Sequence, residues 1–269
     1  MSKPPAKPRL AATVLLMRDA PELEVLMVER HYQIDFAAGA LVFPGGKAND
    51  EDADAGWADL ADGGFEGEQR AARIAATREA FEESGVLLAR PRAARGQGAP
   101  LVGVDVADAL GPHREAVDKR ETSFLGLIRD HDLVLALDTL VHFGHWITPD
   151  MMPKRFDTHF YVTPAPEGQI AAHDGRETTD TVWTCPSKAL EREKAGEATI
   201  IFPTRMNLIK LARARTVAEA VDTFSAEPIV TVLPVVGKDE TGAPCLHIPA
   251  EAGYGQTTEP LENVKNVAR

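Results

Sequence analysis

The chain has 269 residues, 44% of them hydrophobic and 26% charged, and it carries a formal net charge of −12. This balance is that of an ordinary globular protein, long enough for one enlarged domain or a domain with a small appendage. The negative charge argues against a general nucleic-acid-binding protein, which would carry a basic patch. An acidic chain can still bind a phosphorylated substrate if bound cations reverse the local charge.

The two cysteines, Cys185 and Cys245, lie far apart in the sequence and belong to no Cys/His cluster. We therefore expect neither a disulfide nor a zinc site, and we predict a cytoplasmic protein. The apolar run at residues 10–17 is too short to cross a bilayer, and no longer run occurs. We expect no membrane segment.

The first part of the chain predicts short strands separated by turns. Residues 1–9 are rich in Pro and Lys, which predicts a loose tail. The β-branched runs at residues 11–17 and 24–29 flank a turn-forming Asp-Ala-Pro-Glu and predict a hairpin. Residues 39–46 predict a short strand ending in a Pro-Gly-Gly loop, where the backbone can approach a ligand.

One long helix follows an acidic segment. Residues 48–66 are crowded with Asp, Gly and Ala and predict a solvated insertion with one helical turn around Trp57. A helix is predicted over residues 66–84, ended by Gly85. Residues 105–135 show mixed helical spacing and predict a second, helical insertion.

The rest of the chain mixes strands and helices. We predict strands at residues 141–147, 156–162 and 181–184, helices at 186–194 and 203–214, and a strand at 229–236. This order predicts an α/β (α+β) fold with a mixed sheet. We expect one domain over residues 10–214, with residues 215–269 as an extension packed on it.

Three glutamates share one face of the long helix. Glu79, Glu82 and Glu83 fall within about 100° of arc, with the apolar Ile74 and Phe81 opposite for packing on a sheet. Their mutual repulsion is relieved by a cation, and carboxylate oxygens suit Mg²⁺ or Mn²⁺. The alternative is a solvated acidic face. Arg78 favours the metal site, because it stands four residues before Glu82 and can fix that side chain.

Arg78-Glu79-Ala80-Phe81-Glu82-Glu83-Ser84-Gly85 resembles the second half of the Nudix box, and Phe43-Pro44-Gly45-Gly46-Lys47 resembles its first half. The family pattern is Gly-x5-Glu-x7-Arg-Glu-x-x-Glu-Glu-x-Gly. This chain has a longer gap between the halves, and Arg70 stands where the box glutamate is expected. His-Trp-Ile-Thr-Pro at 145–149 and Arg-Phe-Asp-Thr-His-Phe at 155–160 resemble the enlarged-box branch, typified by peroxisomal coenzyme A diphosphatases and their bacterial relatives.

The resemblance implies a Nudix-type α/β/α sandwich, enlarged by helical insertions and a C-terminal extension. It also implies metal-dependent hydrolysis of a phosphoanhydride bond. The substrate would be a nucleoside diphosphate linked to another moiety, such as a coenzyme A or acyl-CoA derivative, a dinucleotide or a nucleotide sugar. Mg²⁺ or Mn²⁺ would be the cofactor, the small-molecule diphosphate the one expected partner, and a homodimer is left open.

The resemblance also assigns roles to residues of the box. Glu79, Glu82 and Glu83 would bind the metal, with the carbonyl of Gly45 completing the shell, and Arg78 would orient them. The general base would be Glu177, six residues before Trp183, or Glu79 itself.

Residues outside the second half of the box are candidates for binding substrate: Arg30, Gly46, Trp146 and Arg155. Trp146 would stack on a ring unless it is a core residue, and Arg155 would meet a phosphate unless it is a surface charge. Asp35 stands where a coenzyme A motif has a second Arg, so coenzyme A is one of several candidate substrates.

Three strand histidines, His142, His145 and His159, have no recognisable ligand spacing, and we interpret them as core or edge residues. Two other functions are weighed against hydrolysis. A nucleotide-binding or regulatory module of the same fold would lack the glutamate trio, which is intact here. A prenyl diphosphate isomerase would need a nucleophilic cysteine in a ligand-facing loop.

Overall fold

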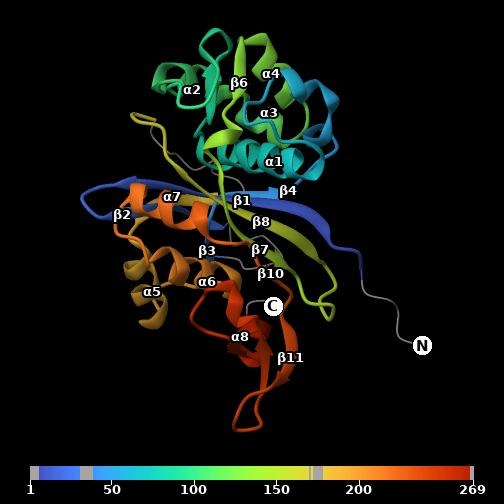
Figure 1. The fold of residues 1–269 in the computed structure, drawn as a ribbon, viewed down its shortest axis with the longest axis vertical. Coiled ribbons are helices and arrows are strands. Elements are labelled where there is room, and N and C mark those ends of the chain that lie inside the picture. Colours follow the sequence, from blue (N-terminus) through green and yellow to red (C-terminus); the bar gives the residue numbers. More distant parts are fainter. Residues whose placement is uncertain (1–5, 31–38, 170, 172–177, 267–269) are drawn as a thin grey trace.

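The computed structural model describes residues 6–30, 39–169, 171 and 178–266, and it has three layers. A central sheet carries helices on both faces (Figure 1). The predicted α/β fold, with a mixed sheet between helical layers, is confirmed by this arrangement. Among the described residues, no helix combines the length and apolar character that crossing a membrane requires.

The central sheet has the strand order β10-β7-β8-β1-β2-β3, with β4 paired to β1 and β9 paired to β2. Its strands are β1 (Arg9–Asp19), β2 (Leu23–Arg30), β3 (Leu41–Val42), β4 (Gly45–Lys47), β7 (Val141–Ile147), β8 (Phe156–Pro164), β9 (Thr178–Thr184) and β10 (Thr231–Val232). The β1–β8 and β7–β10 pairs are parallel and the others antiparallel, so the sheet is mixed.

The upper layer in Figure 1 covers the sheet with the long helix α1 and a cap of shorter elements. These elements are η1 (Glu51–Ala53), η2 (Ala55–Asp59), α1 (Gly67–Ser84), β5 (Ala89–Pro91), η3 (Arg92–Ala94), α2 (Val104–Leu110), η4 (Gly111–His113), α3 (Arg114–Asp118), α4 (Phe124–Asp130), β6 (Leu133–Leu135) and η5 (Leu137–Thr139). Strands β5 and β6 form their own antiparallel pair.

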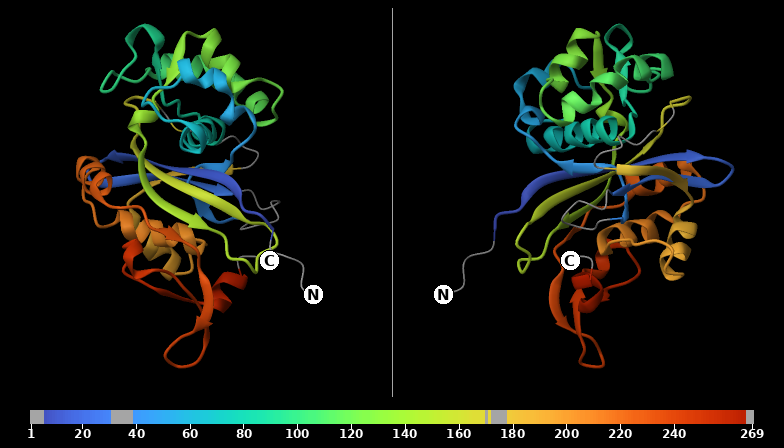
Figure 2. Two further views of the ribbon diagram at one scale, coloured as in Figure 1. Left: turned by 45° about the vertical axis from the view of Figure 1, so that its right-hand side comes forward. Right: turned by 180° about the vertical axis from the view of Figure 1, so that it is seen from behind.

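The lower layer covers the other face and continues into the C-terminal segment. Its elements are α5 (Pro186–Lys194), α6 (Phe202–Leu211), α7 (Val217–Ala226), β11 (Val235–Lys238), β12 (Pro244–His247), η6 (Ala250–Ala252), β13 (Thr258–Pro260) and α8 (Leu261–Asn266). Figure 2 shows the hairpin of β11 and β12, in orange-red, extending away from the sheet. After residue 214, α7 lies in the lower layer and β10 adds a strand to the central sheet. The predicted boundary at residue 214 between a domain and a C-terminal extension stays a prediction.

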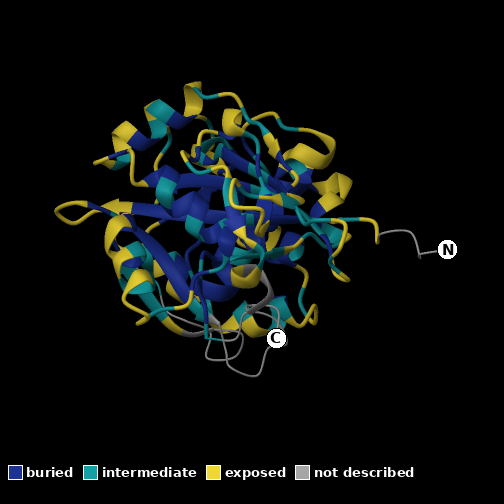
Figure 3. Ribbon diagram, turned by 90° about the horizontal axis from the view of Figure 1, so that it is seen from below, coloured by how far each residue is buried: buried dark blue, intermediate teal, exposed yellow. Residues whose placement is uncertain are grey.

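Two hydrophobic cores follow from the alternation of side chains along β1. Ala12, Val14 and Leu16 belong to the upper core, whereas Leu15 and Met17 belong to the lower one. Successive side chains of a strand point to opposite faces, so a strand buried on both faces is apolar throughout. Figure 3 shows the result, with buried residues along the strands and exposed ones on the outer helices.

The acidic insertion is solvated only in part. Asp50, Asp54 and Asp59 are exposed, and the predicted helical turn around Trp57 is η2. Asp52 and Trp57 are both 0% exposed, and the Trp57 ring packs 5.8 Å from that of Phe124 in α4. The indole Nε1 of Trp57 donates to the carbonyl of Glu51. The prediction missed only the inner side of the segment, which α1 and α4 cover.

The predicted strand at 229–236 is not one continuous strand. It is divided into β10 and β11, with Pro234 between them. Proline has no N–H to donate to a sheet, which accounts for the break. The helix α7 was not predicted, although Thr216 caps it by accepting a hydrogen bond from the N–H of Glu219.

Candidate active site on the acidic face of α1

Helix α1 lies at the centre of the upper half of the molecule. Thirteen of its 18 residues are buried, because the sheet covers one side and the cap covers another. The helix ends at Gly85, whose φ of 74° is favourable for glycine, and the Gly85 N–H donates to the carbonyl of Phe81. Phe81 is fully buried in the upper core, where its ring stacks on Phe124 of α4 at 5.8 Å.

The glutamates of α1 meet the glycine bend at the start of β4. The Gly45 N–H donates to Glu83 Oε2 at 2.9 Å. A Cβ atom on Gly46 would stand 2.4 Å from Glu79 Oε1, so a side chain at this position would displace this carboxylate from the bend. The structure therefore brings together the two halves of the motif that the sequence separates by more than thirty residues.

Arg78 holds two of the three glutamates. Its Nη1 donates to Glu79 Oε1 at 2.9 Å and to Glu82 Oε2 at 2.7 Å. Its Nε and Nη2 donate to the two carboxylate oxygens of Asp52, both at 3.0 Å. A guanidinium that donates to three carboxylates in this way has a fixed orientation, and it also fixes the orientation of those carboxylates.

Asp52 is a site residue that our sequence analysis missed. It stands six residues after Gly46, which is the spacing of the family's Gly-x5-Glu with aspartate in place of glutamate. We had assigned this position to Arg70 by counting back from Arg78. The structure corrects that assignment, since Arg78 pairs with Asp52 and the extra residues follow Asp52.

Burial raises the pKa of Glu82 to about 8, and repulsion from Glu79 adds to the effect, although Arg78 opposes it. Glu82 is 6% exposed, and its Oε1 is buried without a hydrogen-bond partner. An orphaned carboxylate oxygen costs free energy that a cation removes. The donor set consists of carboxylate oxygens, which suits a hard divalent cation, so the residues present fit such an ion.

The three glutamates line the bend without converging on one point. Among the described residues, the set of potential ligands with donor atoms within 4.8 Å of one another is His145, Asp157 and His159. Glu79, Glu82 and Glu83 are instead held on Arg78 and Gly45. Their roles as ligands, like that of the Gly45 carbonyl, stay predictions.

Two candidate substrate residues serve the structure instead. Trp146 is 4% exposed in the lower core, where its Nε1 donates to the hydroxyl of Tyr254 at 2.8 Å. Arg155 is 8% exposed and binds the carbonyls of Thr148 and Ala6 and the carboxylate of Asp150. The predictions that they contact a substrate ring and a phosphate are therefore not supported by their positions.

Other predictions fall where the structure does not describe side chains. Glu177, the predicted general base, and Asp35 lie outside the described residues. Arg30 ends β2, but its side chain is likewise outside the described part. Glu79 is the described candidate for the base.

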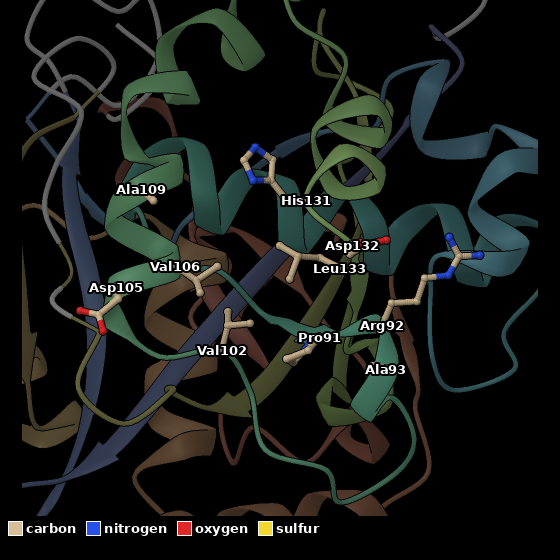
Figure 4. A pocket seen from close by; sticks show the side chains of 10 residues that line it. All are labelled: Pro91, Arg92, Ala93, Val102, Asp105, Val106, Ala109, His131, Asp132 and Leu133. Carbon is tan, nitrogen blue, oxygen red and sulfur yellow. The ribbon is translucent and has the colours of Figure 1, made fainter.

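A pocket of about 700 Å³ lies elsewhere, in the cap (Figure 4). Its lining residues are Pro91, Arg92, Ala93, Val102, Asp105, Val106, Ala109, His131, Asp132 and Leu133. None of them is a predicted site residue. We therefore place the candidate active site at the glutamates and the glycine bend, where Arg78 binds two of the carboxylates and the Gly45 N–H binds the third.

Known proteins resemble this chain in sequence and in fold. An acyl-coenzyme A diphosphatase NUDT19 from Xenopus laevis is 26% identical, over 82% of this chain and 69% of its own length. The acyl-coenzyme A diphosphatase NUDT19 of Homo sapiens is 29% identical, over 75% of this chain and 56% of its own length. The crystal structure of a Nudix hydrolase from Alicyclobacillus acidocaldarius is 27% identical, with a TM-score of 0.67, covering 83% of this chain and 99% of that one.

The family model of the NUDT19 Nudix domain matches residues 66–211. This span contains α1 with its glutamates and the sheet strands β7, β8 and β9. It is more than half of the 269 residues. The chain therefore belongs to the NUDT19 Nudix domain family and is a Nudix hydrolase.

Proposed function

We propose that the protein hydrolyses the phosphoanhydride bond of coenzyme A or an acyl-CoA derivative, with Mg²⁺ or Mn²⁺ held by Glu79, Glu82 and Glu83. The observation that carries the proposal is the buried, orphaned Oε1 of Glu82 beside a glycine bend that reaches Glu79 and Glu83. The choice among diphosphates follows the relatives, two of which are named acyl-coenzyme A diphosphatases.

Nudix hydrolases act with divalent cations on small-molecule diphosphates. Glu79, Glu82 and Glu83 would hold such ions, which would neutralise charge on the diphosphate oxygens and make a water easier to deprotonate. Arg78 keeps the carboxylates of Glu79 and Glu82 in place during this reaction. The Gly45–Gly46 backbone has no side chain to keep the diphosphate away. Either Glu177 or Glu79 then accepts the proton of the attacking water.

The other functions weighed above have less support. A binding module without turnover predicts loss of the glutamate trio, and the trio is present. An isomerase needs a cysteine that faces a ligand. Cys185 lies in the lower layer before α5 and Cys245 lies in β12, and both are buried.

A panel of substrates with Mg²⁺ and with Mn²⁺ tests the proposal. Coenzyme A, a short-chain and a long-chain acyl-CoA, ADP-ribose, a dinucleotide and a UDP-sugar are compared by chromatography of the products. Cleavage of coenzyme A at its phosphoanhydride releases adenosine 3′,5′-bisphosphate and a phosphopantetheine. We expect these products, with coenzyme A derivatives preferred by kcat/KM. Preference for another diphosphate would reject the substrate, and no turnover of any compound would reject the hydrolase.

Location and assembly belong to the same proposal. The prediction of a reducing, cytoplasmic environment rests on Cys185 and Cys245, which form no disulfide. A homodimer stays open, and sedimentation of the purified protein would decide it.

A further inference from the structure

A second cluster of ionisable side chains lies on β7 and β8, neighbouring strands of the sheet (Figure 1). It consists of His142, His145, Asp157 and His159. On β8, Phe160 faces the lower core, whereas Tyr161 faces the upper one. Alternation therefore places Asp157 and His159 on the upper face.

Three of these residues bring donor atoms together. One atom from each of His145, Asp157 and His159 lies within 4.8 Å of the others, and all three residues are half-buried. The Nε2 of His145 is hydrogen-bonded to Asp157 Oδ1. The Nε2 of His159 is buried and has no hydrogen-bond partner.

The other ring nitrogens of the two histidines are already held. His159 Nδ1 lies 3.1 Å from His142 Nε2, and His145 Nδ1 lies 2.8 Å from Thr231 Oγ1 in β10. Metal-binding histidines usually have their second nitrogen in such a hydrogen bond, which fixes the tautomer and the ring orientation. The cluster thus has both an inner set of donors and an outer set that supports them.

We propose that His145, Asp157 and His159 form a second metal site, which takes an imidazole-preferring ion such as Zn²⁺. Two imidazole nitrogens and one carboxylate are a typical set of ligands for zinc, whereas Mg²⁺ prefers oxygen alone. Three protein ligands leave one position for water or a small anion. The rings of His145 and His159 are stacked at 4.3 Å, so one ring would tilt about its hydrogen-bonded Nδ1 for both Nε2 atoms to face the ion.

The sheet register places this cluster in the same row as the glycine bend. His145 pairs with His159, His159 pairs with Ala12, and Ala12 pairs with Gly46. Two strand spacings separate His159 from Gly46, which is roughly 10 Å. A zinc ion there would join β7 to β8 and add positive charge near the active site. The inference does not depend on the proposed substrate.

Zinc binding to the chelator-treated protein tests the proposal. Calorimetry is done in excess Mg²⁺, so that the oxygen-rich glutamate site is already occupied. We expect one Zn²⁺ per chain for the wild type and for Glu82→Gln. His145→Gln and His159→Gln should each weaken Zn²⁺ binding by at least 100-fold. When loaded with Co²⁺, these two variants should lack the visible absorption of the Co²⁺-loaded wild type. His131→Gln, at an exposed histidine of the cap, should bind like the wild type.

A variant of His142 tests the residues that support the ligands separately from the ligands themselves. His142→Phe keeps a ring of similar shape but removes the partner of His159 Nδ1, so Zn²⁺ affinity should fall about 10–100-fold. Circular dichroism confirms that each variant is folded, and Asp157→Asn replaces any histidine variant that is not. Unchanged zinc stoichiometry and affinity in the folded His159 or Asp157 variant would overturn the proposal, as would no zinc bound by the wild type.

Discussion

The acidic face of α1 and the histidine cluster of β7 and β8 both gather metal-binding side chains, but the chain assembles them differently. The glutamates come from one turn of a helix, at positions 79–83. The histidines come from two strands and meet through the sheet register. A site built within one helix is visible in the sequence, whereas a site built across strands appears only when the strands are paired.

A bulge explains why the histidine spacing is unrecognisable. His142 and His145 are three residues apart, which in a regular strand would place them on opposite faces. The register of β7 against β8 shifts between His142 and Gly144, so one extra residue enters β7 there. Both rings then contact His159 on the same face.

The largest expected effect is the loss of activity in Glu82→Gln. The amide keeps the shape of the side chain and still accepts a hydrogen bond from Arg78, but it removes a negative ligand. We expect kcat to fall by about 100-fold or more, as when one electrostatic contribution to a transition state is lost. Glu68→Gln, on the exposed first turn of the same helix, should keep full activity. Equal rates for the two variants would show that the glutamates of the acidic face do not contribute to catalysis.

Asp52→Asn tests how the acidic face is supported. Asp52 accepts two hydrogen bonds from Arg78, and both side chains are nearly inaccessible to solvent. We expect the free energy of unfolding to fall by about 1.5–3 kcal/mol, the usual contribution of charged hydrogen bonds. Denaturant unfolding measures this change. Asp59→Asn, an exposed position in the same insertion, is the control and should stay within about 0.5 kcal/mol of the wild type.

The two clusters should also respond to pH in opposite directions. Burial lowers the pKa of His142 to about 3 and that of His159 to about 4. Their contribution to stability is complete above the ordinary pKa of about 6.5 and is lost as the pH falls from there towards 4. Burial raises the pKa of Glu82 to about 8, so its contribution is present below about 4.5 and is lost as the pH rises towards 8.

Unfolding in the presence of a chelator, from pH 4 to pH 8, separates these contributions. His159→Gln should flatten the loss of stability on the acid side, and Glu82→Gln should flatten the loss on the alkaline side. His131→Gln should change neither. Parallel profiles for all four proteins would mean that neither cluster titrates as described.

The smallest effect is expected on the other face of the sheet. Trp146→Phe removes the hydrogen bond to Tyr254 below the sheet, which should cost about 0.5–1.5 kcal/mol of stability. KM should change by less than about twofold, because Trp146 is buried in the lower core. A large rise in KM without loss of stability would restore Trp146 as a substrate residue.

The sequence predicted the elements whose signals are local. Helix α1, its end at Gly85, the first hairpin and the strands β7 and β8 follow from periodicity and turn residues, and the structure confirms them. The motif predicts that the glutamates of α1 lie beside the glycine bend, and the contact of Glu83 with Gly45 agrees with this prediction.

The errors arose where distant parts of the chain determine the environment. The segment at 48–66 is polar in composition, yet α1 and α4 bury Asp52 and Trp57. The sequence left Trp146 as a substrate-stacking or a core residue, and Arg155 as a phosphate-binding or a surface residue. In the fold the Tyr254 hydroxyl accepts from Trp146, and neighbouring carbonyls accept from Arg155. Neither partner is visible in a linear motif.

Manganese binding followed by electron paramagnetic resonance tests the central claim most directly, since free Mn²⁺ gives a signal that bound Mn²⁺ loses. The wild type and His159→Gln should take up Mn²⁺ with equal affinity, and Glu82→Gln should bind it at least tenfold more weakly. Binding by Glu82→Gln equal to that of the wild type would contradict the assignment of the metal to the acidic face of α1.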